Sequence, residues 1–306
     1  MFSVVFPGQG SQVVGMCRDL YNKFDLFKGV YKEADEILDY PLSKIILDGP
    51  KDILDLTENT QPAIFLVGYS IFRLINEEFN INLHNAKFFA GHSLGEYTAL
   101  ACSGVLSFSD TLKILKLRGK AMQASVEDGE GSMVAVLGSD IKIIEKILYE
   151  NKKNFECYIA NDNSDGQIVV SGKISCLDKF SIELKKNNIK FVKLSVSAPF
   201  HCPLMGNATN DMKKVISDTD FKNPYVSIIS NVTAKPVNES NTIKKLLIEQ
   251  IEKPVRWRES VKTMISQRTN KFIELGPGKV LSGLVKRIDR NVQLNQINNL
   301  DDIKIL

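Results

Sequence analysis

The stretch Gly91-His92-Ser93-Leu94-Gly95 follows a short strand-like run at residues 87–90 and precedes the helix-compatible residues 96–100. A strand that turns at once into a helix strains the backbone of the central serine and leaves no room for side chains two residues away on either side. The turn lifts the serine hydroxyl clear of the sheet, and the helix N-terminus provides positive potential for a developing oxyanion. The pattern predicts that Ser93 is a nucleophile.

The segments on either side of this turn alternate between strand-like and helix-like patterns. Before it, residues 2–6 form an apolar strand and residues 61–79 have helical length and periodicity; after it, residues 111–124 form a helix. The alternation resumes after Pro199, with strands expected near 226–229, 271–274 and 292–297. This order predicts an α/β fold, an α/β-hydrolase-like domain in which helices cover a largely parallel sheet.

Between these two parts the pattern changes to strand, helix, strand, strand, helix, strand. The strands are expected at 132–137, 155–160, 167–171 and 189–196, and the helices at 141–150 and 177–186. This βαββαβ order is the split pattern of ferredoxin-like domains. We therefore expect a discontinuous catalytic domain of residues 1–128 and 198–306, with an inserted small domain of residues 129–197.

Composition narrows the class of protein. The 306 residues are 43% hydrophobic and 25% charged, as in ordinary globular proteins, and the net charge of +3 argues against nucleic-acid binding. No apolar run approaches the roughly 20 residues that cross a bilayer, and the first residues lack the basic segment of a signal peptide. The five cysteines form no CxxC pair. We expect a cytoplasmic protein without disulfides, a metal site or a membrane partner.

The general base must come from one of three histidines. His84 lies in a polar stretch and is expected in a surface loop. His92 adjoins Ser93, but a tight turn points successive side chains in different directions, so we expect it to support the turn. His201 lies in the rigid loop Ala198-Pro199-Phe200-His201-Cys202-Pro203, which can place a side chain over a neighbouring site. Elimination favours His201 as the base, although no acidic third member of a triad stands out.

One arginine is expected to face the protein interior. Lys113, Lys116 and Lys120 form a stripe on the helix 111–124, and at about 100° per residue Arg118 points roughly 165° away from them. A buried guanidinium is costly without an anion. The partner of Arg118 is either an internal Asp or Glu or the carboxylate of a substrate, held by two parallel hydrogen bonds.

Four motifs in one order carry a resemblance that runs essentially end to end. They are Phe6-Pro7-Gly8-Gln9-Gly10-Ser11-Gln12, Gly91-His92-Ser93-Leu94-Gly95-Glu96, Phe200-His201 and Glu274-Leu275-Gly276-Pro277-Gly278-Lys279. With these motifs the chain resembles the malonyl-CoA:acyl carrier protein transacylases of bacterial-type fatty acid synthesis. The resemblance implies that malonyl-CoA and acyl carrier protein are the partners and that malonyl passes through an ester on Ser93. It implies no metal and no bound organic cofactor, and we expect a monomer.

The resemblance also implies roles for individual residues. Ser93 corresponds to the acylated nucleophile, and His201 corresponds to its base and acid. The backbone N–H groups of Gln9 and Leu94 correspond to the oxyanion hole, and the backbone carbonyl of Gln250 to the group that orients the histidine. Arg118 matches the arginine that binds the malonyl carboxylate. Phe200 resembles forms that accept malonyl, and Asn163 resembles a polar residue near the family's site.

Three other readings stay open from the residues alone. A serine thioesterase would use the same turn and histidine but release the acyl group to water. A non-catalytic acyl-binding or scaffold protein would need neither Ser93 nor His201. A transacylase that carries a different acyl group would not need the carboxylate role of Arg118.

Overall fold

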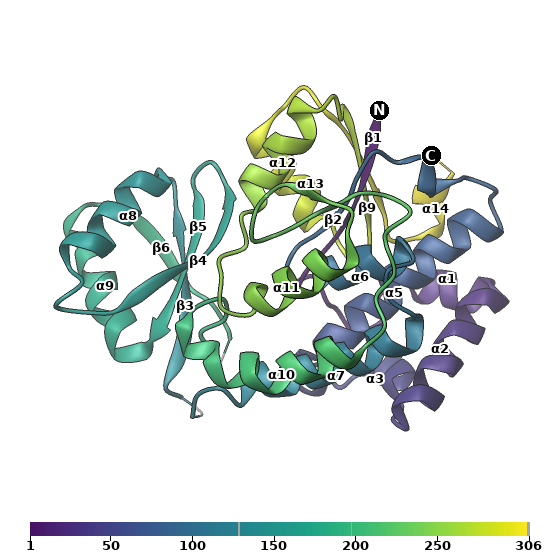
Figure 1. The fold of residues 1–306 in the computed structure, drawn as a ribbon, viewed down its shortest axis with the longest axis horizontal. Helices are drawn as coiled ribbons and strands as arrows, with labels where there is room; N and C mark the ends of the chain where they lie inside the picture. The colour runs from purple at the N-terminus through teal and green to yellow at the C-terminus, as the bar shows by residue number, and fades with distance from the viewer. Residues whose placement is uncertain (128, 197, 305–306) are drawn as a thin grey trace.

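The computed structural model of the protein describes residues 1–127, 129–196 and 198–304, and two sheets organise them (Figure 1). The larger sheet has the strand order β10-β9-β1-β2-β7-β8, and adjacent strands run parallel except for the edge pair β7–β8. These strands are β1 (Phe2–Phe6), β2 (Phe89–Gly91), β7 (Ile228–Ile229), β8 (Pro236–Val237), β9 (Lys271–Leu275) and β10 (Gln293–Ile297).

Strand β1 lies inside this sheet because its residues are apolar on both faces. Val4, Val5 and Phe6 are fully buried. Since side chains alternate across a strand, Val4 and Phe6 pack into the main core, whereas Val5 packs into a second core with Trp257 and Phe272. A parallel sheet covered by helices on both faces needs such continuous apolar strands.

Helices cover both faces of the larger sheet. The long α5 packs against α6 and α7 in the main core, and α12 and α13 pack together in the second core. The helices of this part are α1 (Arg18–Lys23), α2 (Asp25–Leu38), α3 (Leu42–Asp48), α4 (Lys51–Asp55), α5 (Thr57–Glu77), α6 (Leu94–Cys102), α7 (Phe108–Gln123), α10 (Gly206–Asp218), α11 (Ser240–Gln250), α12 (Trp257–Ser266), α13 (Val280–Ile288) and α14 (Leu300–Ile303), with short 3₁₀ turns at Leu83–Asn85 and Pro203–Met205. Within the described ranges, no helix is both long and apolar enough to span a membrane.

The smaller sheet is antiparallel and has the order β4-β5-β3-β6. In chain order its elements are β3 (Gly131–Leu137), α8 (Ile141–Glu150), β4 (Cys157–Ser164), β5 (Gln167–Lys173), α9 (Ile174–Lys186) and β6 (Lys190–Lys193). Both helices pack on one face, where Val134 and Val136 meet Ile144 and Phe180. The alternate residues Met133 and Ala135 belong to the main core, so the other face of this sheet turns toward the larger part (Figure 1).

The expected mixed α/β architecture, with one sheet containing parallel strands and a second antiparallel sheet, is confirmed. Strand 2–6 and helix 141–150 have the expected bounds. The expected strand 189–196 is shorter, because only Lys190–Lys193 pairs along β3 as a strand. The expected domain boundaries at residues 128 and 197 fall outside the described residues, as do residues 305 and 306.

Candidate active site

Ser93 lies at the turn between β2 and α6. Its backbone has φ 53° and ψ −111°, a strained conformation for a residue with a side chain. The turn is tight enough to exclude side chains on both sides: a Cβ on Gly91 would lie 1.9 Å from the Gly95 carbonyl, and a Cβ on Gly95 would lie 2.2 Å from the Phe6 carbonyl oxygen. The strand, the sharp turn and the helix occur in the predicted order, although the strand is Phe89–Gly91 and not residues 87–90.

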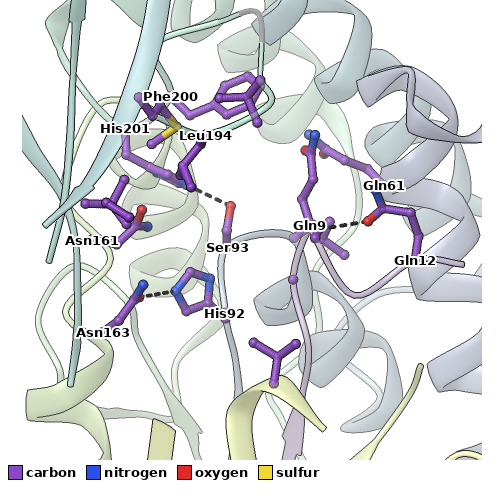
Figure 2. Close-up of a pocket in the computed structure, with 18 of the residues that line it drawn as sticks. Gln9, Gln12, Gln61, His92, Ser93, Asn161, Asn163, Leu194, Phe200 and His201 are labelled. Atoms are coloured by element: carbon purple, nitrogen blue, oxygen red, sulfur yellow. Dashed lines mark hydrogen bonds between the residues drawn. The ribbon is translucent and has the colours of Figure 1, made fainter. Parts of the chain in front are cut away.

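His201 is in hydrogen-bond contact with the Ser93 hydroxyl. The Ser93 Oγ and His201 Nε2 atoms are 2.8 Å apart (Figure 2). On the other side of the ring, His201 Nδ1 is 2.8 Å from the backbone oxygen of Gln250. A carbonyl oxygen can only accept, so Nδ1 carries the proton and Nε2 is free to accept from Ser93. The geometry thus contains a serine, a histidine and an orienting carbonyl in place of an acid.

The electrostatic surroundings keep this histidine neutral. Burial first, and the positive charge of Arg118 second, lower the pKa of His201 to about 3. The imidazole is therefore unprotonated at neutral pH and can accept a proton from the serine.

Arg118 lies on α7 and is 1% exposed, as its inward position on the helix predicts. Its guanidinium donates to Gln61 Oε1 at 2.8 Å, to Gln250 Oε1 at 2.9 Å and to Ser93 Oγ at 3.2 Å. It also lies over the ring of Tyr97, with 5.3 Å from Cζ to the ring centre. None of the ion pairs formed by the described residues includes Arg118. Amide, hydroxyl and aromatic groups therefore surround a buried cation that lacks a carboxylate partner.

The loop after β1 lies on the other side of Ser93. Gln12 closes this loop, because its Oε1 accepts from the Gly10 N–H at 2.8 Å and its Nε2 donates to Asp55 Oδ1 at 2.9 Å (Figure 2). Within the part of the chain that the structure describes, the backbone N–H groups of Gln9 and Leu94 donate to no protein acceptor. Both residues line the same cavity as Ser93.

A cavity of about 560 Å³ connects these groups. One wall comes from the larger part of the protein, with Gln9, Ser93 and Arg118, and the other wall comes from the smaller sheet, with Met133 and Asn163. Phe200 lines the cavity beside His201. A volume of this size accommodates a small-molecule ligand or the end of a longer one.

His92 joins the two walls and does not contact Ser93 as a base. Its Nε2 lies 2.8 Å from Asn163 Oδ1 on β4 (Figure 2). His84 is exposed on its 3₁₀ turn, and its ring contacts the backbone oxygen of Cys102 at 3.1 Å. Of the three histidines, His201 alone contacts the serine hydroxyl, as elimination predicted.

Three residues of the site escaped the sequence analysis in whole or in part. Asn231 accepts from the Ser93 N–H at 2.8 Å and donates to the Gly91 carbonyl at 2.7 Å. Gln61 holds Arg118, and Glu96 accepts from Gln250 Nε2 at 2.7 Å. Glu96 ends the motif Gly91-His92-Ser93-Leu94-Gly95-Glu96, and its place three residues after Ser93 could have marked it as a site residue. Nothing in the local sequence pattern distinguishes Asn231 or Gln61.

Known proteins resemble this chain over its whole length. A family model described as an acyl transferase domain matches residues 3–298. The malonyl CoA-acyl carrier protein transacylase of Bacillus subtilis is 39% identical over 303 residues, covering 98% of this chain and 94% of the relative. The chain belongs to the malonyl-CoA:acyl carrier protein transacylase family. The transacylase of Haemophilus influenzae is 37% identical and covers 98% of this chain and 96% of its own length.

Solved structures of transacylases share this fold. An acyl-carrier-protein-S-malonyltransferase from Bartonella henselae has a TM-score of 0.96 and 40% identity, covering 99% of this chain and 97% of the other. A type II PKS acyl-carrier protein in complex with its malonyl-transacylase gives a TM-score of 0.95 at 34% identity, with 99% and 97% coverage. The transacylase family and the mixed α/β fold are therefore established together.

Proposed function

We propose that this chain transfers the malonyl group of malonyl-CoA to the phosphopantetheine thiol of acyl carrier protein, which supplies malonyl units for fatty acid chain elongation. One observation carries the substrate assignment: a buried arginine without a carboxylate partner donates to the oxygen of a serine that is also hydrogen-bonded to a histidine. The names of the relatives support the same reaction.

The first half-reaction forms an ester on Ser93. His201 Nε2 accepts the hydroxyl proton while Ser93 Oγ attacks the thioester carbonyl of malonyl-CoA. The carbonyl oxygen becomes an oxyanion that the N–H groups of Gln9 and Leu94 hold. When the intermediate collapses, the carbon–sulfur bond breaks, and the CoA sulfur leaves with the proton from His201.

The second half-reaction reverses these steps with another thiol. His201 removes the proton of the phosphopantetheine thiol, whose sulfur attacks the malonyl ester. The ester bond breaks, and Ser93 recovers the proton from His201. Two sequential exchanges at one serine give ping-pong kinetics and an acyl-enzyme that can be isolated. Neither half-reaction calls for a metal ion or a bound organic cofactor.

Arg118 selects the acyl group in this scheme. Its guanidinium is charged and desolvated, and a carboxylate forms two charge-assisted hydrogen bonds with such a group. The free carboxylate of malonyl matches this requirement, whereas an acetyl group has no anion to offer. Phe200, on the same cavity as His201, limits the room for a branch at the malonyl α-carbon.

Several finer assignments belong to the same proposal. The larger part is α/β-hydrolase-like, which its serine turn supports, and the smaller part is ferredoxin-like, which the strand order β4-β5-β3-β6 supports. We place the domain boundaries at residues 1–128 with 198–306, and 129–197. We also propose that the enzyme works in the cytoplasm as a monomer, with acyl carrier protein as its protein partner.

Intact-mass measurement tests the central claim. The purified protein is mixed with malonyl-CoA without an acceptor, in parallel with Ser93→Ala. One malonyl increment is expected on the unaltered chain and none on the variant. Continuous CoA release without an increment would identify a thioesterase instead. No increment and no release would mean that the acyl group, or the enzymatic role itself, is wrong.

A further inference from the structure

A buried carboxylate lies next to the reacting groups, and the mechanism above does not use it. Glu96 is in the first turn of α6, three residues after Ser93, and is 3% exposed. Its Oε2 accepts from Gln250 Nε2 at 2.7 Å and from the Asn231 backbone N–H at 3.2 Å. A buried carboxylate is costly unless hydrogen bonds or a nearby positive charge compensate for its lost hydration.

Gln250 connects Glu96 to both His201 and Arg118. Its backbone oxygen accepts from His201, and its side-chain Oε1 accepts from Arg118 Nη2 at 2.9 Å. Its Nε2 donates to Glu96 and also to the Ser93 backbone oxygen at 3.1 Å. An amide side chain has one donating and one accepting end. Because an ionised Glu96 can only accept, it fixes the Nε2 end toward itself and leaves Oε1 for Arg118, which can only donate.

Asn231 connects Glu96 to the serine turn. Its side chain bridges the Ser93 N–H and the Gly91 carbonyl, and its backbone N–H is held by Glu96. The strained φ of Ser93 persists only where surrounding contacts enforce it. Glu96 therefore anchors the residue that clamps the nucleophile as well as the residue that orients the base.

We propose that Glu96 is a positioning residue, whose ionised carboxylate aligns Ser93, His201 and Arg118 through Asn231 and Gln250. This inference rests on the proposed function for the identity of the substrate, but not for the activation of Ser93. The negative charge of Glu96 also stabilises the positive charge of Arg118, although Gln250 lies between the two side chains. The guanidinium consequently has a negative charge nearby and still no direct carboxylate partner, which leaves it to bind the substrate anion.

The pH dependence of Ser93 reactivity distinguishes a positioning role of Glu96 from a purely structural role. Burial raises the pKa of Glu96 to about 7, against the lowering effects of the Gln250 and Asn231 hydrogen bonds and the charge of Arg118. The carboxyl group therefore gains a proton as the pH falls through about 7, and the aligned, ionised form predominates above that pH.

The other titratable groups that face this network have pKa values shifted away from 7. Burial lowers the pKa of His201 to about 3 and raises that of Tyr97 to about 12. Burial also lowers the pKa of His92 from 6.5. Arg118, on α7, stays protonated throughout. A change in reactivity centred near pH 7 therefore belongs to Glu96.

The experiment measures how fast Ser93 reacts with a fluorophosphonate, from about pH 5.5 to about pH 8.5. The probe forms an Oγ–phosphorus bond and releases fluoride, so it reports serine activation whatever the natural acyl group is. We expect labelling of the unaltered protein to rise with pH through about 7. Glu96→Gln should label about 10²-fold more slowly at pH 8, the loss that a small misalignment causes, and should lack the rise. Glu96→Asp should keep the rise.

Glu145→Gln, on the exposed face of α8, is the matched control and should behave like the unaltered protein. Thermal unfolding of each variant checks that it is folded. If Glu96→Gln labels at the unaltered rate with the same pH profile, the proposal is overturned. Should that variant not fold, a flat profile of the unaltered protein over the same pH range would overturn it equally. If the unaltered protein is labelled at Ser93 with the expected pH profile but transfers no malonyl group, the result would instead count against the proposed substrate.

Discussion

Replacing Arg118 by alanine separates recognition of the malonyl carboxylate from the chemistry at Ser93. The substitution removes the donors to Gln61 and Gln250 and one donor to Ser93 Oγ, but leaves His201 and its carbonyl partner in place. An acetyl group has no carboxylate, so its transfer does not depend on a cation at this position. The rate with malonyl-CoA therefore reports the loss of carboxylate recognition, whereas the rate with acetyl-CoA reports any effect on the chemistry at Ser93.

The expected loss follows from the two hydrogen bonds that the carboxylate makes. A hydrogen bond to a charged group contributes about 1.5–3 kcal/mol, so a bidentate pair contributes about 3–6 kcal/mol. Coulomb's law at an effective dielectric constant of about 20 gives about 4 kcal/mol for charges about 4 Å apart, within that interval. Since about 1.4 kcal/mol is a factor of ten, kcat/KM for malonyl-CoA should fall by about 10²–10⁴. The value for acetyl-CoA should fall by about tenfold or less, because the hydrogen bond to Ser93 Oγ is the only lost contact that touches a reacting atom.

The assay is the initial rate of acyl transfer to holo acyl carrier protein from each thioester. Arg118→Lys keeps a charge but not the planar pair of donors, and should lie between the alanine variant and the unaltered protein for malonyl-CoA. Lys113→Ala, exposed on the same helix, is the control and should change neither rate. Equal losses for malonyl-CoA and acetyl-CoA in Arg118→Ala would refute the assigned role of this arginine.

Three further predictions concern stability. The pKa of His201 falls from 6.5 to about 3 on folding, so between these pH values the unfolded chain binds a proton that the folded chain does not, and the protein loses stability as the pH drops below about 6.5. Between pH 7 and pH 5, the free energy of unfolding of His201→Gln, measured with urea, should therefore fall by about 2 kcal/mol less than that of the unaltered protein. Parallel pH profiles of the two proteins would contradict this. Gly95→Ala should prevent folding because its Cβ would meet the Phe6 carbonyl. The control Gly29→Ala, whose Cβ has no neighbour within 4 Å, should have the same melting temperature as the unaltered protein or a higher one. A soluble and active Gly95→Ala variant would show that the turn can relax. Glu274→Ala removes the acceptor of the Leu281 and Ser282 N–H groups at the start of α13 and should lower the free energy of unfolding by about 2–4 kcal/mol, so an unchanged melting temperature would mean that water replaces the carboxylate.

The elements that the sequence analysis predicted well are those with strong local patterns. The apolar run of β1 and the period of α8 gave bounds that match the structure. The inward position of Arg118 followed from helix geometry alone. Lys116, expected on the wet face of the same helix, is instead partly covered, because its long side chain folds back over the Tyr40 ring and donates to Asn59.

Other features lacked a local signal. The strands β7 and β8 have two residues each, too few for a periodic pattern. The helices α1, α3 and α4 have only six, seven and five residues, and they pack on α2, α5 or one another. The contact between Asn231 and Ser93 spans 138 positions in the chain. Only the folded topology brings such residues together, so neither spacing nor composition could single out Asn231.

The strand order of the larger sheet has a consequence for synthesis of the chain. β1 pairs with β2 on one edge and with β9, residues Lys271–Leu275, on the other. The smaller sheet, in contrast, uses only the contiguous segment from Gly131 to Lys193. On a ribosome that adds residues one at a time, the smaller sheet can therefore form early, while β1 keeps one edge unpaired until most of the chain has emerged. Such an open edge invites pairing with other chains, so we expect the nascent protein to depend on chaperones that cover exposed strands during this interval.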